Sequence, residues 1–156
     1  MLTRWILVTV VAVLVGSDVT AVGLASANRF RARLDLLQVA KTPDEARCGV
    51  EPRVRIDLTG EGRITRIGRV TAEASHCTTD DPSSIPFDSG VLVMSASEGD
   101  IFIAYSGSDN AGDLEGTFTI SGGTGVFAGA TGGGTLSGAV VPGEERGRIV
   151  LDGWID

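Results

Sequence analysis

Hydrophobic and polar residues alternate along the chain between positions 30 and 36. The two sets interleave with a period of two: Phe30, Ala32, Leu34 and Leu36 on one side, and Arg31, Arg33 and Asp35 on the other. Successive side chains of a strand point to opposite faces, so this period predicts a strand with one buried face. Pro43 and the polar residues beside it end the strand.

Further strands are predicted by apolar or alternating runs separated by turn residues. They cover 54–58, 63–75, 90–97, 101–106, 114–121, 131–141 and 146–155, with a short extra segment at 126–130. The turns between them contain Gly60-Glu61-Gly62, Glu98-Gly99-Asp100, the glycine-rich 122–125 and Pro142-Gly143-Glu144-Glu145. No segment after residue 27 has a helical pattern of useful length.

About eight strands with regularly spaced turns predict an all-β fold, either a sandwich or an up-and-down antiparallel barrel. A calycin-like barrel is favoured, because closing the sheet removes exposed strand edges that no other element here could cover. Composition agrees with a turn-rich globular domain, since 22 of the 156 residues are glycine, 42% are hydrophobic and 21% are charged.

The N-terminal segment 1–27 is interpreted as a signal peptide. Arg4 is followed by an apolar run from Trp5 to Val15, and Ala25-Ser26-Ala27 has the small-x-small form of a cleavage site. An uncleaved membrane anchor is the alternative, but the run is shorter than the roughly 20 residues that a spanning helix needs. We therefore expect a single domain over 28–156 that is exported, to the periplasm or outside the cell.

Export bears on Cys48 and Cys77, the only two cysteines. An oxidising compartment permits a disulfide between them. A hairpin turning about Gly60–Gly62 places both near its open end, and a bridge there is predicted. A reactive Cys77 thiol activated by the neighbouring His76 is the competing interpretation. It is weakened because neighbours in a strand point to opposite faces.

Charge excludes some classes of partner. The formal net charge is −7, whereas binding to nucleic acid or to an anionic membrane requires a basic surface. We expect neither partner after signal cleavage.

The stretch from Gly116 to Ala130 reads GTFTISGGTGVFAGA, and a glycine-rich strand follows it. This run resembles the ITGGTG-x-F-x-GA-x-G segment of allene-oxide-cyclase-like and dirigent-like barrels. The preceding SEGDIFIAYSG, residues 97–107, is similar to the hairpin before that segment in small secreted bacterial members, and 60–69 is a weaker match. The resemblance covers roughly residues 55–155 and implies an eight-stranded antiparallel barrel. No functional residue of those families can be placed on this chain.

The glycines of this stretch are interpreted as a structural turn. Gly122, Gly123 and Gly125 can adopt positive φ where the chain reverses, and Phe127 can fold back against the barrel end. A phosphate cradle is the alternative reading of Gly-Gly-x-Gly, but neither a helix nor a lysine follows it.

No catalytic, cofactor or metal site is predicted. His76 is the only histidine and lies in no serine-nucleophile motif. His76 with Asp80 and Asp81 would be a poor zinc set, and the carboxylates offer no selected pair. Trp154 is expected in the core or in packing at the barrel end.

The sequence thus predicts an exported, disulfide-stabilised barrel that binds a small hydrophobic ligand or serves as a structural module. A cyclase-like or isomerase-like enzyme acting on an apolar molecule in the lumen is the alternative, because such an enzyme depends on positioning more than on strong acids or bases. Apolar residues on both faces of some strands would also suit a homo-oligomer.

Overall fold

The computed structural model describes residues 28–50, 52–79, 85–141 and 143–156. The segment interpreted as a signal peptide, 1–27, lies outside the described residues. So do Asp80 and Asp81, together with the rest of the predicted loop 80–84.

The described chain forms an antiparallel barrel of eight strands in sequence order, closed by pairing of the first strand with the last. The strands are β1 (Asn28–Thr42), β2 (Arg53–Ile64), β3 (Gly68–Thr79), β4 (Ile85–Ala96), β5 (Gly99–Asn110), β6 (Asp113–Gly123), β7 (Gly132–Val140) and β8 (Arg146–Ile155). The predicted all-β, eight-stranded antiparallel barrel is confirmed.

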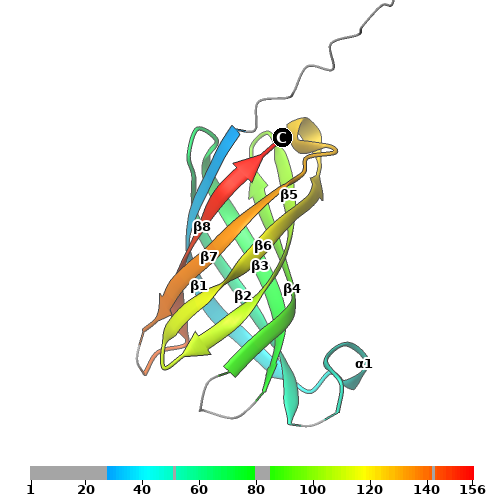
Figure 1. Ribbon diagram of the computed structural model, residues 1–156, viewed down its shortest axis with the longest axis vertical. Helices are drawn as coiled ribbons and strands as arrows, with labels where there is room; N and C mark the ends of the chain where they lie inside the picture. Colours follow the sequence, from blue (N-terminus) through cyan, green and yellow to red (C-terminus); the bar gives the residue numbers. More distant parts are fainter. Residues whose placement is uncertain (1–27, 51, 80–84, 142) are drawn as a thin grey trace, which may run out of the picture.

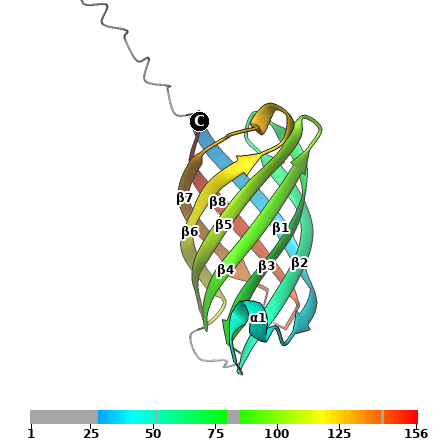
Figure 2. The same ribbon diagram turned by 90° about the vertical axis from the view of Figure 1, so that its right-hand side faces the viewer.

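Two short helical turns mark the two ends of the barrel (Figures 1 and 2). The helix α1 (Glu45–Cys48) lies at the end where β1 finishes and β2 begins, and the 3₁₀ turn η1 (Gly125–Phe127) lies at the opposite end, near the C-terminus. We refer to these as the α1 end and the η1 end. Within the described residues, no helix has the length and apolar character needed to cross a membrane.

Side chains fill the lumen in the half nearest η1. Phe30 and Phe118 pack with ring centroids 5.7 Å apart, and they belong to one buried cluster with Leu34, Ile64, Met94, Ile101, Ile120 and Leu151. Phe127, from η1, packs against this core. The η1 half is therefore a solid hydrophobic core.

The first hairpin turns later than the sequence predicted. Gly60 pairs with Ala72 inside the sheet, and the chain reverses at Thr65–Ile67. The prediction of one strand over 63–75 was therefore wrong. Gly60 and Gly62 look like turn residues in the sequence, but they occupy alternating positions of β2 that face the lumen. The turn itself has Arg66 with φ +71° and Gly68 with φ +112°.

The three glycines of the turn at the η1 end have different structural roles. Gly122 and Gly125 have positive φ, at +148° and +57°. Gly123 does not have a positive φ. A Cβ there would lie 2.7 Å from Phe127 Cβ, so this glycine permits Phe127 to pack closely. Residues 126–130, expected as a short strand, contain the end of η1 instead. Trp154 was expected in packing, but it is 44% exposed on β8.

Candidate functional site: an apolar cavity with a histidine–tyrosine pair

The lumen is hollow in the half nearest α1. A cavity of about 430 Å³ occupies it. Its apolar lining comes from seven strands: Leu36, Ile56, Leu58, Ala74, Ile85, Phe87, Leu92, Leu114, Leu136, Val140 and Ile149. This volume falls in the range of pockets that enclose small organic ligands.

Glycines at lumen-facing positions explain why this half is hollow. Cross-strand partners share a face of the sheet, and several large lining residues have a glycine as their partner. The pairs are Leu36 with Gly60, Phe87 with Gly107, Leu136 with Gly116, and Ile149 with Gly138. Each of these glycines leaves a lumen-facing position without a side chain, and a Cβ there would meet the backbone of the neighbouring strand.

Three rings lie together on one side of the cavity, and two of them, His76 and Tyr105, are polar. His76 Nδ1 lies 2.9 Å from Tyr105 Oη, within hydrogen-bond distance. The His76 ring centroid is 5.2 Å from that of Phe87 and 5.9 Å from that of Tyr105. All three residues line the cavity, so a ligand would meet a hydrogen-bonded pair beside an aromatic wall.

Two of the lumen glycines hold the rings in place. Gly90 is the cross-strand partner of Tyr105, and a Cβ on it would lie 2.7 Å from Tyr105 Cδ2. A Cβ on Gly107 would lie 2.6 Å from Phe87 Cζ. Both rings therefore approach the backbone so closely that a side chain at either glycine position would displace them.

Burial keeps both members of the pair neutral. It lowers the pKa of His76 from 6.5 to about 4, and the positive charge of Arg47 acts in the same direction, while Asp88 opposes it. Burial also raises the pKa of Tyr105 well above its usual value, against a smaller opposite effect of Arg47. At neutral pH the pair thus carries one N–H and one O–H proton and no charge.

This protonation state fixes what the pair can offer to a ligand. One proton is used in the hydrogen bond between the two side chains, and the other remains free to donate. If Tyr105 donates to Nδ1, then Nε2–H is the free donor; if Nδ1–H donates, the Tyr105 hydroxyl is. In either tautomer the pair presents one donor and one acceptor.

The helix α1 fixes the strand that carries His76. The guanidinium of Arg47 donates to Ser75 Oγ at 2.7 Å, to the Ser75 carbonyl at 3.1 Å and to the Ser89 carbonyl at 2.6 Å. Ser75 precedes His76, and Ser89 has φ +52° at an irregularity of β4. Arg47 thus clamps β3 to β4 directly behind the histidine.

The disulfide joins α1, which carries Arg47, to strand β3. Cys48, which follows Arg47, is bonded to Cys77, which follows His76, with 5.3 Å between the Cα atoms. The predicted pairing is present, although its geometric reason was wrong: Cys77 pairs with Arg55 in the sheet, and Cys48 lies in α1 rather than in a strand. His76 faces the lumen while the neighbouring Cys77 is bonded to α1.

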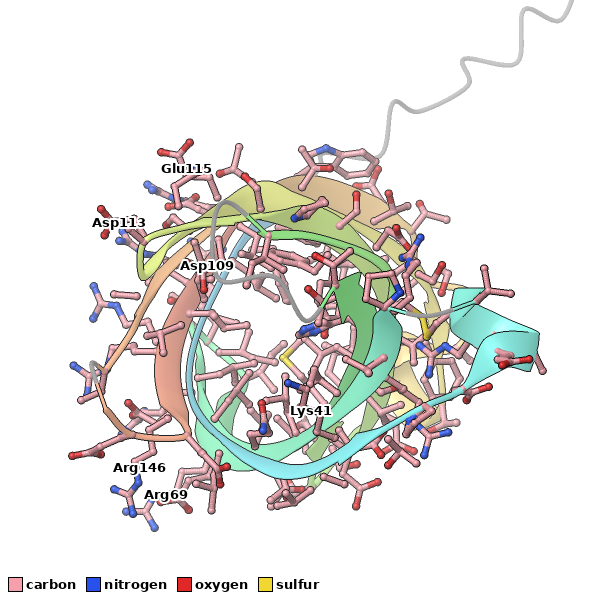
Figure 3. The ribbon with its side chains drawn as sticks, turned by 90° about the horizontal axis from the view of Figure 1, so that it is seen from below. Lys41, Arg69, Asp109, Asp113, Glu115 and Arg146 are labelled. Atoms are coloured by element: carbon pink, nitrogen blue, oxygen red, sulfur yellow. A yellow bond between two sulfur atoms is a disulfide. The ribbon has the colours of Figure 1, made fainter. Side chains whose placement is uncertain are left out.

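Charged side chains surround the mouth of the cavity at the α1 end. Figure 3 looks into this end, with Lys41 reaching over the opening and Asp109 at its edge. Glu144, Glu145 and Arg146 also belong to the lining. The interior is therefore apolar and the entrance polar.

Sequence reasoning missed this site. His76 was interpreted as the single histidine, next to Cys77 in a strand and in no serine-nucleophile motif, whereas the structure places it on the lumen wall against Tyr105. The position of Tyr105 two residues beyond Ile103 on an alternating strand was a usable signal, but Phe102 and Ile103 make both faces of that strand apolar. Among the described residues, no group of three or more His, Cys, Asp or Glu could hold a metal ion.

Comparisons of the chain with protein-family models, with curated proteins and with solved structures found no match. The resemblance to allene-oxide-cyclase-like barrels therefore stays a prediction based on sequence motifs, because a barrel shape alone does not identify that family.

Proposed function

We propose that the protein binds a small, mainly apolar molecule in the α1 half of the barrel lumen. The observation that carries this proposal is the cavity of about 430 Å³ with an apolar wall and one hydrogen-bonded polar pair. A structural module would gain nothing from an unfilled lumen, since voids in a core reduce stability. The combination of apolar wall and convergent polar groups is typical of ligand sites.

The polar pair selects a class of ligand. A neutral donor and acceptor side by side fit a hydroxyl or carbonyl group at one end of the molecule. A carboxylate fits less well, because burying its charge beside a neutral imidazole is costly. The proposed ligand is therefore an uncharged, largely hydrocarbon molecule with a single oxygen function.

Export is part of the same proposal. The disulfide is compatible with an oxidising compartment. A ligand that dissolves poorly in water would then be held, in an exported barrel, away from the solvent.

The test is a titration with the neutral fluorescent probe N-phenyl-1-naphthylamine. Ala74 is buried in the cavity wall, whereas Ala104 is exposed on the outer face of β5. The full chain should bind the probe, Ala74→Leu should bind it at least about tenfold more weakly because the added side chain takes up cavity volume, and Ala104→Leu should bind it as the parent does. Equal binding by both variants would place the probe outside the lumen and refute the proposal.

A second function, proton transfer on a bound carbonyl compound, is favoured by the neutrality of the His76–Tyr105 pair. Nε2 can accept a proton from the carbon beside a carbonyl, while Nδ1 passes its proton to Tyr105 Oη and the hydroxyl passes its own to the carbonyl oxygen. An enol forms, one C–H bond breaks, and no side chain gains a charge. An apolar wall penalises charged intermediates, so this concerted relay suits the site.

Deuterium exchange tests this second function. If the protein catalyses this proton transfer, 2-decanone in D₂O should lose the NMR signals of the protons on the carbons next to its carbonyl group. Tyr105→Phe should abolish the exchange while leaving probe binding within about threefold, because it removes one hydroxyl and little apolar surface. Exchange at the rate of buffer alone would leave binding as the function.

A further inference from the structure

A second concave site lies on the outside of the barrel at the η1 end, away from the apolar cavity. It is a groove of about 830 Å³ formed by β1, β2 and the turn that follows β2. Five of its lining residues are arginines: Arg29, Arg31, Arg33, Arg63 and Arg66. The only acidic lining residue is Asp35, which accepts a hydrogen bond from Arg148 Nε at 2.8 Å. A chain of net charge −7 thus concentrates positive charge in one groove.

Most of this charge is not neutralised by the protein. Arg29 and Arg31 approach the same carboxylate, Asp152, at 3.3 and 3.6 Å. Within the part of the chain that the structure describes, Arg33, Arg63 and Arg66 form no ion pair. At least three guanidinium groups are therefore left to a partner from outside.

The arginines occupy positions that are unfavourable in the bare protein. Arg33 faces Arg63 directly across the β1–β2 ladder, and Arg63 faces Arg69 across the β2–β3 ladder. Like charges at directly opposed positions of a sheet destabilise it. An anion bound in the groove would relieve the repulsion between Arg33 and Arg63, which both line it.

Two further features are found at residues of the groove. Arg66 has φ +71° in the turn, a backbone conformation that non-glycine residues rarely adopt. The Nε atom of Arg31 is buried and lies 3.6 Å from Asp152 Oδ2, within ion-pair range but beyond hydrogen-bond distance. Arg31 and Arg66 both line the groove.

We propose that this groove binds a soluble anion with two or more phosphate groups close together, of the tripolyphosphate type. The planar guanidinium group matches phosphate oxygens with two parallel N–H donors. Several such groups in one groove match an anion with several adjacent charges better than a single phosphate. The site is separate from the lumen, so this proposal does not rest on the proposed ligand-binding function.

Isothermal titration calorimetry with sodium tripolyphosphate on the full chain tests the proposal. Arg63→Gln and Arg33→Gln should each weaken binding at least about tenfold, because each removes charge-assisted hydrogen bonds to phosphate. The matched control is Arg69→Gln, which removes one arginine charge from the neighbouring strand β3, outside the groove. Arg69 does not line the groove and points away from the barrel wall (Figure 3), so its loss should weaken binding less than about threefold.

Folding of the variants is checked by thermal unfolding. Removing Arg63 relieves like-charge repulsion, so Arg63→Gln should unfold at the parent temperature or above it while losing affinity. If Arg63→Gln did not fold, Arg33→Gln would decide.

Three results would overturn the proposal. Absence of any heat of binding at low ionic strength would remove the site. Equal weakening by Arg69→Gln and Arg63→Gln would show attraction to overall charge rather than to a groove. Binding to vesicles that contain phosphatidylglycerol without binding to tripolyphosphate would make the arginines a membrane contact instead of a soluble-anion site.

Discussion

The hydrogen bond between His76 and Tyr105 joins two side chains whose pKa values move in opposite directions for one reason. Burial in an apolar lumen opposes any charge, so it lowers the pKa of the imidazole and raises that of the phenol. Neither residue can act as a strong base or acid at neutral pH. Both can act as hydrogen-bonding groups or as neutral carriers of a proton.

The lowered pKa of His76 predicts a pH dependence of stability. The unfolded chain binds a proton at about pH 6.5, whereas the folded protein does so only at about pH 4. Between these values the unfolded state holds more protons, so the free energy of unfolding falls as pH falls from 6.5 to 4. The contribution is about 3 kcal/mol.

Urea unfolding at pH 7 and pH 4 measures this contribution in the parent and in His76→Gln, which cannot titrate there. The parent should lose about 3 kcal/mol more than the variant over this interval, since the carboxylates contribute equally to both. Identical losses would show that the imidazole is not shielded from water.

Gly90 is predicted to be essential for the position of Tyr105. In Gly90→Ala the new methyl group would meet the tyrosine ring at 2.7 Å, so the ring must move or the strand must bend. We expect a loss of about 1 to 3 kcal/mol, as for other overpacked sites. Gly147→Ala is the matched control, because its Cβ would be 3.4 Å from the nearest atom. Equal stability of the two variants would contradict the packing described for Tyr105.

The partner of a residue could be predicted from the sequence only where residue type or local spacing restricts the choice. The pairing of Cys48 with Cys77 followed from having only two cysteines and an expected oxidising compartment. The association of His76 with Tyr105 joins strands β3 and β5, 29 residues apart in sequence. It depends on the shear of a closed barrel, which no local pattern reveals.

The short helix α1 holds β3 and β4 together where both strands are irregular. Asp44 accepts a hydrogen bond from Arg47 N at 3.1 Å and so caps the short helix. The helix in turn holds the Arg47 side chain against two carbonyls of neighbouring strands. An isolated four-residue helix would not persist in water, so the hydrogen bonds of Arg47 and the disulfide hold it against the barrel.

Removing the disulfide tests this arrangement. The bridge spans 29 residues in sequence, and in the chain-entropy model the double variant Cys48→Ala/Cys77→Ala should lose about 3 to 4 kcal/mol. Urea unfolding measures the loss, and the single variant Arg47→Gln, which keeps the bridge, should lose less. A change below about 1 kcal/mol in the double variant would show that α1 does not need its covalent attachment.

Strand positions were predictable from alternation, but some boundaries were not. Residues 60–62 carry two glycines, which indicate a turn, yet these glycines lie in β2, where a Cβ would clash with the backbone carbonyl of Asp35 or Arg33 on β1. The true turn contains Arg66 at positive φ, a residue that turn statistics do not favour there. The extra strand at 126–130 failed for a related reason, because Gly125 and Phe127 close a 3₁₀ turn.

At the scale of the molecule, one barrel presents two chemically different sites. The lumen is solid near η1 and hollow near α1, while the outer wall near η1 carries the arginine groove. The closed barrel itself was predictable, since about eight amphipathic strands have few other ways to cover their edges. The hollow half of the lumen was not predictable, because the register between strands decides which large residue lies opposite each glycine.

NMR of the His76 ring tests whether this histidine lines a cavity that accepts an apolar ligand. The chain has one histidine, so its ring signals need no further assignment once any purification tag is removed. We predict that the ring titrates with a pKa of about 4 and that its signals shift when N-phenyl-1-naphthylamine is added to the parent but not to Ala74→Leu. A ring that titrates near 6.5 and does not respond to the probe would show that His76 is exposed to water and that the lumen does not bind the probe.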